Sequence, residues 1–100
     1  MNRKNLAIKF ANSLGFPEIK KIILFGSVAR GEDNKDSDID ILIVSTKKAE
    51  TKNKIMAKIT DALLEGGIYI SAKVISQKEY ENLKNTHFIS TINKEGVVIG

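Results

Sequence analysis

The chain has 100 residues, of which 42% are hydrophobic and 28% charged, and it contains no cysteine. This length and composition predict one small globular domain, residues 1–100, and the absence of cysteine excludes disulfide bonds and thiolate chemistry. No apolar run approaches the roughly 20 residues of a membrane-spanning helix. The short basic N-terminus is too polar for a signal peptide, so we expect a cytoplasmic protein without a membrane partner.

The net charge of the chain is +4, from 16 basic and 12 acidic residues. The basic residues are spread along the chain in groups no larger than pairs, with few aromatic residues between them. A lysine-rich, solvated surface explains this pattern better than a nucleic-acid interface does. We therefore expect no direct contact with nucleic acid.

Hydrophobic spacing predicts alternating helices and strands in the first half of the chain. Apolar residues repeat on one helical face and are followed by a glycine and a proline, which end that helix. An isoleucine-rich run then predicts a buried strand, and a polar loop separates it from a second strand with alternating polarity. The expected elements are a helix at residues 2–14, a strand at 20–25, a turn with one helical turn at 26–31, and a strand at 38–45.

The second half of the chain continues this alternation. Ser76 and Glu79 have the spacing of a capping box, which predicts the start of a short helix. The expected elements are a helix at residues 47–65, a strand at 68–75, a helix at 76–84, a helical turn at 88–93 and a strand at 97–99. The order αββαβαβ predicts an α/β (α+β) fold, with a small mixed sheet and helices packed mainly on one face.

A glycine–serine pair stands where the first strand ends. Gly26 has no Cβ, so a phosphate can approach its backbone, and Ser27 supplies a hydroxyl and a backbone N–H at the start of a helical turn. A tight turn between two strands would explain the same pair. The pair alone therefore does not define a site.

Two aspartates at the start of the second strand favour a binding site, rather than a simple turn, at the glycine–serine pair. Asp38 and Asp40 are two residues apart, so both project from the same face of the strand. Neighbouring carboxylates repel each other unless a cation lies between them, and Mg²⁺ prefers oxygen ligands that it shares with substrate phosphates. Further along, the same face becomes apolar, which is typical of a site at the mouth of a buried strand. The sequence therefore predicts a Mg²⁺ site at Asp38 and Asp40.

Two residues near these motifs are further candidates for phosphate binding. Arg30 has a planar guanidinium that suits bidentate phosphate contacts, although a salt bridge to an acid in the following loop would use it equally well. Ser37 stands where it can brace the start of the second strand. The predicted nucleotide- and phosphate-binding residues are Gly26, Ser27, Arg30 and Ser37.

The run from Leu24 to Gly31, together with the run from Asp36 to Ile43, resembles the GSxARG…SDxD signature of the DNA polymerase beta-like nucleotidyltransferases. The short chain is similar to the minimal nucleotidyltransferase (MNT) group of that superfamily, and its last residues resemble the ending of small members. The signature is specific, and the order of elements fits over most of the chain. The resemblance implies the nucleotidyltransferase fold.

The resemblance also implies a reaction. Gly26 and Ser27 would hold the β- and γ-phosphates of ATP or another nucleoside triphosphate. Asp38 and Asp40 would be the catalytic residues and would hold one or two Mg²⁺ ions. An acceptor hydroxyl would attack the α-phosphate and receive a nucleoside monophosphate, which is AMP when ATP is the substrate. In the MNT group the acceptor can be a tyrosine of a HEPN-domain toxin, so the resemblance implies a toxin–antitoxin partner.

One part of the signature is missing. Full catalytic members carry a third carboxylate on a later strand, but the strand expected at residues 68–75 contains no acid. The corresponding position is Ser71 or Lys73, or Ala72 in another register. Lys73 either brings positive charge to the phosphates or extends into solvent. Two functions stay open: a working nucleotidyltransferase, and a degenerate nucleotide-binding antitoxin that acts by complex formation alone.

The remaining aromatic and titratable residues form no motif. His87 is expected in a loop or at the surface, and Tyr69 and Tyr80 are expected to pack in the core. The last strand would leave a free sheet edge, which is compatible with a homodimer or a complex with another protein.

Overall fold

The computed structural model describes residues 2–32, 34 and 38–100. Each predicted helix and strand is present, and the two predicted helical turns are the short helices α2 and α5. The bounds differ from the prediction by at most two residues. The elements are α1 (Arg3–Asn12), β1 (Ile19–Phe25), α2 (Gly26–Arg30), β2 (Ile39–Ser45), α3 (Lys48–Gly66), β3 (Ile70–Ser76), α4 (Gln77–Leu83), α5 (His87–Glu95) and β4 (Val97–Val98).

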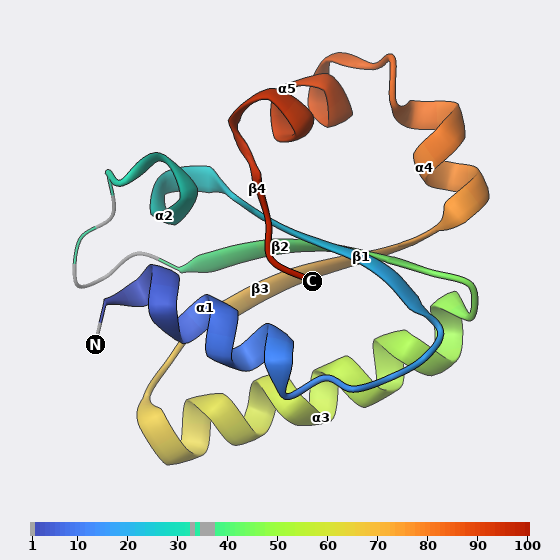
Figure 1. Cartoon of the computed structure of the whole chain (residues 1–100). Coiled ribbons are helices and arrows are strands. Elements are labelled where there is room, and N and C mark those ends of the chain that lie inside the picture. The colour runs from blue at the N-terminus through green and yellow to red at the C-terminus, as the bar shows by residue number, and fades with distance from the viewer. Residues whose placement is uncertain (1, 33, 35–37) are drawn as a thin grey trace.

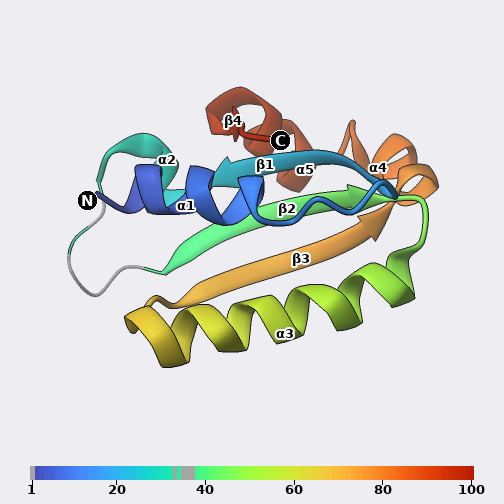
Figure 2. The same ribbon diagram turned by 60° about the horizontal axis from the view of Figure 1, so that its bottom comes forward.

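The strands form one mixed sheet in the order β3-β2-β1-β4. β1 pairs antiparallel with both β2 and β4, whereas β2 and β3 run parallel. A parallel pair needs a long crossover connection, and α3 supplies it. Figure 2 shows α3 beside β3 along the sheet. The predicted mixed α/β fold is therefore confirmed, and the last strand lies at a sheet edge as expected.

One face of the sheet carries the larger hydrophobic core. The two longest helices, α1 and α3, pack against it (Figure 1). Isoleucines at alternate positions of β2 supply the centre, as the predicted strand alternation requires. The buried residues of this core are Ala7, Ala11, Leu14, Ile22, Leu24, Val28, Ile39, Ile41, Ile43 and Ile55.

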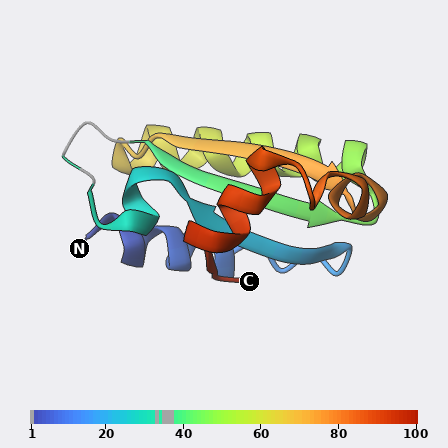
Figure 3. The same ribbon diagram turned by 90° about the horizontal axis from the view of Figure 1, so that it is seen from above.

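The opposite face carries a smaller core beneath α5 and the start of α4. Four buried residues form it, Ile23, Leu42, Ile89 and Ile92, and Phe25, Ile75 and Tyr80 pack around them. Figure 3 shows α5 lying over β1 and β2, with α1 and α3 on the far side of the sheet. Helices thus cover the first face along its length and the second face only in part. Asp40 and Leu42 belong to this second face because they alternate with the isoleucines.

Local hydrogen bonds fix the start of α4 as predicted. The Ser76 hydroxyl accepts from the Glu79 N–H at 3.0 Å, and the Glu79 carboxylate accepts from the Ser76 N–H at 3.0 Å. The capping box is therefore confirmed. Within the described part of the chain, no helix is long and apolar enough to cross a membrane.

Candidate functional site

The glycine–serine turn and the two aspartates meet at one end of the sheet. Antiparallel pairing sets Phe25, the last residue of β1, opposite Asp40 of β2. α2 begins at the next residue, Gly26. Figure 1 shows α2 above the start of β2. The two predicted motifs, separated in sequence by a loop, are therefore neighbours in space.

Gly26 lies so close to Asp40 that a side chain at position 26 would force the Asp40 carboxylate to move. Its φ angle of +77° lies in the left-handed region, where side chains are strained. A Cβ at this position would collide with the Oδ2 atom of Asp40. Glycine is therefore favoured at position 26 for two independent reasons, and the backbone of the turn lies directly against the carboxylate.

The short helix α2 begins without a side-chain cap. Phe25 is its N-cap residue and offers no oxygen to the first backbone N–H groups, and the half-buried Ser27 lies in its first turn. Gly31 ends the helix with a φ angle of +73°. The N–H groups of Gly31 and Glu32 then donate to the carbonyls of Val28 and Ser27, at 3.2 and 2.9 Å. This Schellman arrangement explains the second glycine of the motif.

The carboxylate of Asp40 is in an environment that disfavours its charge. Burial raises the pKa of Asp40, the neighbouring charge of Asp38 raises it further, and Arg30 acts weakly in the opposite direction. Asp38 is exposed at the mouth of β2. A hard divalent cation between the two carboxylates would remove their repulsion, and both supply the oxygen ligands that Mg²⁺ prefers. The donor set therefore fits Mg²⁺.

Arg30 has anionic partners. Its Nε donates to Glu32 Oε2 at 3.2 Å, and its Nη1 lies 3.5 Å from Glu95 Oε2. These acids raise the pKa of Arg30, Glu32 most strongly. The salt bridge weighed for this residue is thus present to Glu32, while Asp33 and Asp36 lie outside the described residues. Ser37, the fourth predicted phosphate ligand, also lies outside them.

The register of the parallel strand β3 shows which candidate position for the third acid lies beside Asp40. Ser71 is the register partner of Asp40, and Lys73 is the partner of Leu42. Ser71 therefore occupies the position next to Asp40 on the same face. Lys73 is exposed, and its Nζ lies 5.7 Å from the ring centre of Phe88. Among the described residues, no three carboxylate, histidine or cysteine side chains are grouped so that they could hold a metal.

The expectation that Tyr69 packs in the core is wrong. Its neighbours Ile68 and Ile70 pack against the larger core, so Tyr69 faces the other side of the sheet and is 62% exposed. Its carbonyl accepts from the Ile39 N–H at 2.9 Å, which puts it beside the Asp38 end of β2. The alternation of β3 already put Tyr69, Ser71 and Lys73 on one face, and that was the signal available in the sequence. Tyr80 is half-buried against the smaller core, as expected.

Aromatic residues beside the aspartates were missed by sequence reasoning. Phe25 and Phe88 meet edge to face, with ring centres 6.3 Å apart, and both line a cavity of about 440 Å³ that also touches Gly26 and Arg30. The exposed His87 begins α5 and lines the same cavity. Nothing in the spacing of Phe88 links it to a motif more than 40 residues away. Only the fold brings it to the site.

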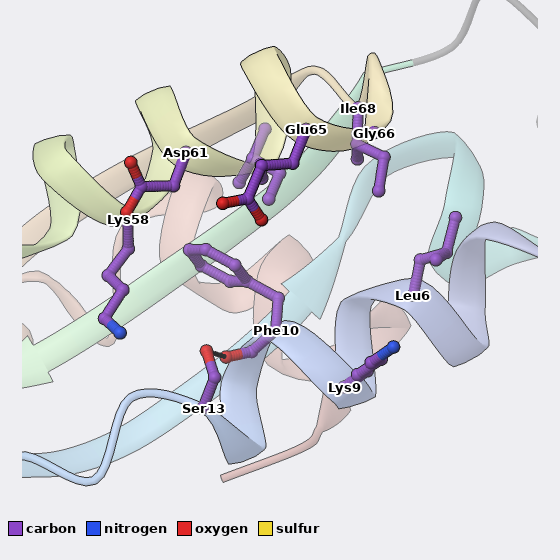
Figure 4. Close-up of a pocket in the computed structure, with 11 residues that line it drawn as sticks. Leu6, Lys9, Phe10, Ser13, Lys58, Asp61, Glu65, Gly66 and Ile68 are labelled. Atoms are coloured by element: carbon purple, nitrogen blue, oxygen red, sulfur yellow. Dashed lines mark hydrogen bonds between the residues drawn. The ribbon is translucent and has the colours of Figure 1, made fainter.

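Another cavity, of about 460 Å³, lies between α1 and α3. Figure 4 shows Phe10 of α1 pointing toward α3, with Lys58, Asp61 and Glu65 along that helix. None of the predicted site residues lines this cavity. It opens on the face of the sheet opposite Asp40 and is separate from the candidate site.

Comparisons with known proteins identify the family of this chain. The family described as "Nucleotidyltransferase domain" matches residues 7–99. A Methanocaldococcus jannaschii protein named "Putative protein adenylyltransferase MJ0604" is 37% identical over 102 aligned residues, which cover 99% of each chain. A second protein of that organism, MJ0141, has the same description and is 33% identical over 85 residues, 82% of this chain and 80% of its own.

Solved structures share the fold at low sequence identity. A chain from a mutant of the toxin–antitoxin MntA–HpeT superposes with a TM-score of 0.61 at 17% identity, over 100% of this chain and 73% of its own. A chain from tri-AMPylated Shewanella oneidensis HEPN toxin in complex with MNT antitoxin gives 0.53 at 16% identity, over 97% and 68%. This protein therefore belongs to the nucleotidyltransferase domain family, and its fold is that of the minimal, MNT-type members.

Proposed function

We propose that this single-domain chain is a cytoplasmic, Mg²⁺-dependent enzyme that transfers AMP from ATP to a hydroxyl of a partner protein. The family to which it belongs transfers nucleoside monophosphates. The observation that carries the proposal is the direct contact between the Gly26 backbone and the Asp40 carboxylate. A triphosphate at the turn and a cation at the aspartates would then lie side by side.

Each residue of the site has a role in this proposal. The backbone at Gly26 and the hydroxyl and N–H of Ser27 bind the β- and γ-phosphates. Arg30, at the end of α2, adds positive charge to the site. To contact a phosphate, its guanidinium would give up part of its ion pairing with Glu32 and Glu95. Ser37 remains a candidate phosphate ligand from the sequence alone.

Asp38 and Asp40 hold Mg²⁺ in this proposal. When bound, the metal neutralises phosphate charge and makes the α-phosphorus more electrophilic. The raised pKa of Asp40 supports this role, because a cation favours the ionised form that burial and Asp38 disfavour.

The acceptor oxygen forms its bond to the α-phosphorus as the bond from that phosphorus to pyrophosphate breaks. The acceptor loses its proton in the same step. Because β3 contains no acidic residue, this strand offers no carboxylate as the base. We assign the proton to solvent.

The proposed partner is a HEPN-domain protein. The support is indirect: chains in two MNT or MntA toxin–antitoxin complexes share the fold, and in one of them the HEPN toxin is AMPylated. The name of the 37% identical relative, a protein adenylyltransferase, supports a protein as acceptor and ATP as donor.

A second candidate is a nucleotide-binding antitoxin that acts by complex formation alone. The observation in its favour is Ser71 beside Asp40, together with the absence of a three-ligand metal group from the described residues. Binding of Mg-ATP without transfer would be its signature.

Incubation with α-phosphate-labelled ATP and Mg²⁺ separates the two candidates. The chain is tested alone and with a HEPN-domain protein encoded beside it. Under the proposal, label appears on the partner and requires Mg²⁺, and the double variant Asp38→Asn, Asp40→Asn labels nothing. Asp61→Asn is the matched control, because Asp61 is an exposed aspartate on α3 outside the site.

The decisive contrary result is a partner that stays unlabelled while the chain binds both Mg-ATP and that partner. Toxin neutralisation that persists in the double aspartate variant would give the same answer. Either result would favour the binding-only antitoxin.

A further inference from the structure

A cavity of about 440 Å³ opens next to the proposed phosphate turn. Gly26 and Arg30 form one part of its wall, and one side of α5 forms the other. Its volume lies within the roughly 300–1,000 Å³ that small-molecule sites occupy. Asp38 and Asp40 do not line it. The cavity is therefore a neighbour of the proposed metal site and needs its own explanation.

Two aromatic rings line the cavity near the aspartates. Phe25 lies opposite Asp40 in the antiparallel pair, so the two side chains share a face of the sheet. Phe88 meets Phe25 edge to face and remains 46% exposed. The ammonium of Lys73 lies 5.7 Å from the centre of the Phe88 ring. An accessible aromatic surface is thus close to both a carboxylate and the ammonium of Lys73.

Polar groups occur at only a few points of the cavity wall. His87 and Thr91 offer hydrogen-bonding groups from α5, and the ion pair between Arg30 and Glu95 contributes charged groups. Apolar and aromatic walls with a few convergent polar groups are the usual composition of a site for a flat heteroaromatic ligand.

We propose that this cavity holds the nucleobase of the nucleoside triphosphate, with the ring of Phe88 as its stacking surface. The inference rests on the proposed function, because it needs the phosphates to lie at Gly26. Stacking on an aromatic ring accepts any base and is stronger for a larger ring system, so the ligand class is a nucleoside triphosphate, with purines bound more tightly than pyrimidines. His87 and Thr91 are the groups that can contact the edge of the base.

Tyr69 is the competing aromatic residue. It is exposed on the same face and lies beside the Asp38 end of β2, but it does not line the cavity. It therefore serves as the comparison that tells a specific stacking surface from a general aromatic effect.

The test compares ATP with inorganic tripolyphosphate, which has the phosphates and no base. Calorimetry with Mg²⁺ measures both ligands on the intact chain and on Phe88→Leu, Phe88→Trp and Tyr69→Ala. We expect the intact chain to bind ATP more tightly than tripolyphosphate. Phe88→Leu should weaken ATP about 5- to 100-fold and leave tripolyphosphate unchanged. Phe88→Trp should retain ATP binding, and Tyr69→Ala should change neither ligand.

Three results would overturn the inference while leaving the phosphate site intact. These are equal affinities of the intact chain for the two ligands, unchanged ATP affinity in Phe88→Leu, and a loss of ATP affinity in Tyr69→Ala only. Binding of neither ligand would overturn the proposed function and the base site together. Phe88→Leu keeps an apolar side chain, and a thermal melt verifies that each variant is folded.

Discussion

The two faces of the sheet differ in how completely helices cover them. α1 and the 19-residue α3 lie along one face and bury a continuous core that includes three isoleucines of β2. On the other face, α5 and α4 bury a cluster of four residues and leave the start of β2 and β3 uncovered. Asp40, Ser71 and Lys73 lie in this uncovered part. The packed face stabilises the fold, and the open face is free to bind ligand.

The largest expected effect is the loss of stability when a buried isoleucine of either core is truncated to alanine. Ile55 on α3 and Ile92 on α5 are both buried, at 1% and 2% exposure. Ile55→Ala should lower the free energy of unfolding by about 3–5 kcal/mol, and Ile92→Ala by about 2–3 kcal/mol, because the smaller core can relax or admit water more easily. Urea unfolding measures both. A loss for Ile92→Ala as large as that for Ile55→Ala would contradict this difference between the two faces.

A smaller effect on stability, with a large effect on function, is expected at the two glycines of α2. Gly26 and Gly31 both have positive φ angles, so alanine at either should cost about 1–2 kcal/mol. Only at Gly26 would the new Cβ strike Asp40; at Gly31 the space is open. Gly26→Ala should therefore lower Mg-ATP affinity or AMP transfer at least 100-fold, and Gly31→Ala should lower neither beyond its effect on stability. Equal losses would show that backbone strain, not the contact with Asp40, matters.

The smallest expected effect concerns the charge of Asp40. Because burial and Asp38 raise the pKa of Asp40 in the folded chain, folding disfavours its ionised form. The protonated carboxyl of Asp40 therefore favours the folded state. This stabilisation is complete at pH values below the ordinary pKa of an aspartate and is lost as the pH rises through the raised pKa of Asp40 in the folded chain. Without metal at pH 7, Asp40→Asn should therefore melt about 1–4 °C above the unmodified chain, a small gain because the side chain is half-exposed.

That gain should shrink as the pH falls toward 4, and Asp61→Asn should show none of it. Mg²⁺ should raise the melting temperature of the unmodified chain and leave Asp40→Asn unchanged. A pH-independent gain would mean that packing, rather than charge, separates the two proteins.

Most of the fold could be predicted because local signals and tertiary packing agree. The alternation of Asp40 and Leu42 with Ile39 and Ile41 sets both faces of β2, and the structure has the same faces. The capping box at Ser76 marks α4 in the same way. Helix ends were predicted less well: α1 stops at Asn12, before the glycine and proline that were expected to end it.

The site could be predicted only as far as its motifs extend. The residue types and the spacing of Gly26, Asp38 and Asp40 identify these residues in the sequence. Phe88 lies on α5, far along the chain, and only the fold brings it to the site. The position beside Asp40 depended on the register of β3, which hydrophobic spacing leaves open by one residue. Tyr69 was misjudged because an aromatic residue next to two isoleucines resembles core, although strand alternation turns it outward.

The contact between Gly26 and Asp40 has a consequence for protein engineering. The turn lies against the carboxylate because β1 and β2 pair in one register, with Phe25 opposite Asp40. Grafting the signature as a loop, without its two strands, would therefore not transfer the site. A designer who grafts it onto another scaffold must transfer both strands with their pairing, since a shift of one residue would turn the acids to the opposite face and separate them from the turn.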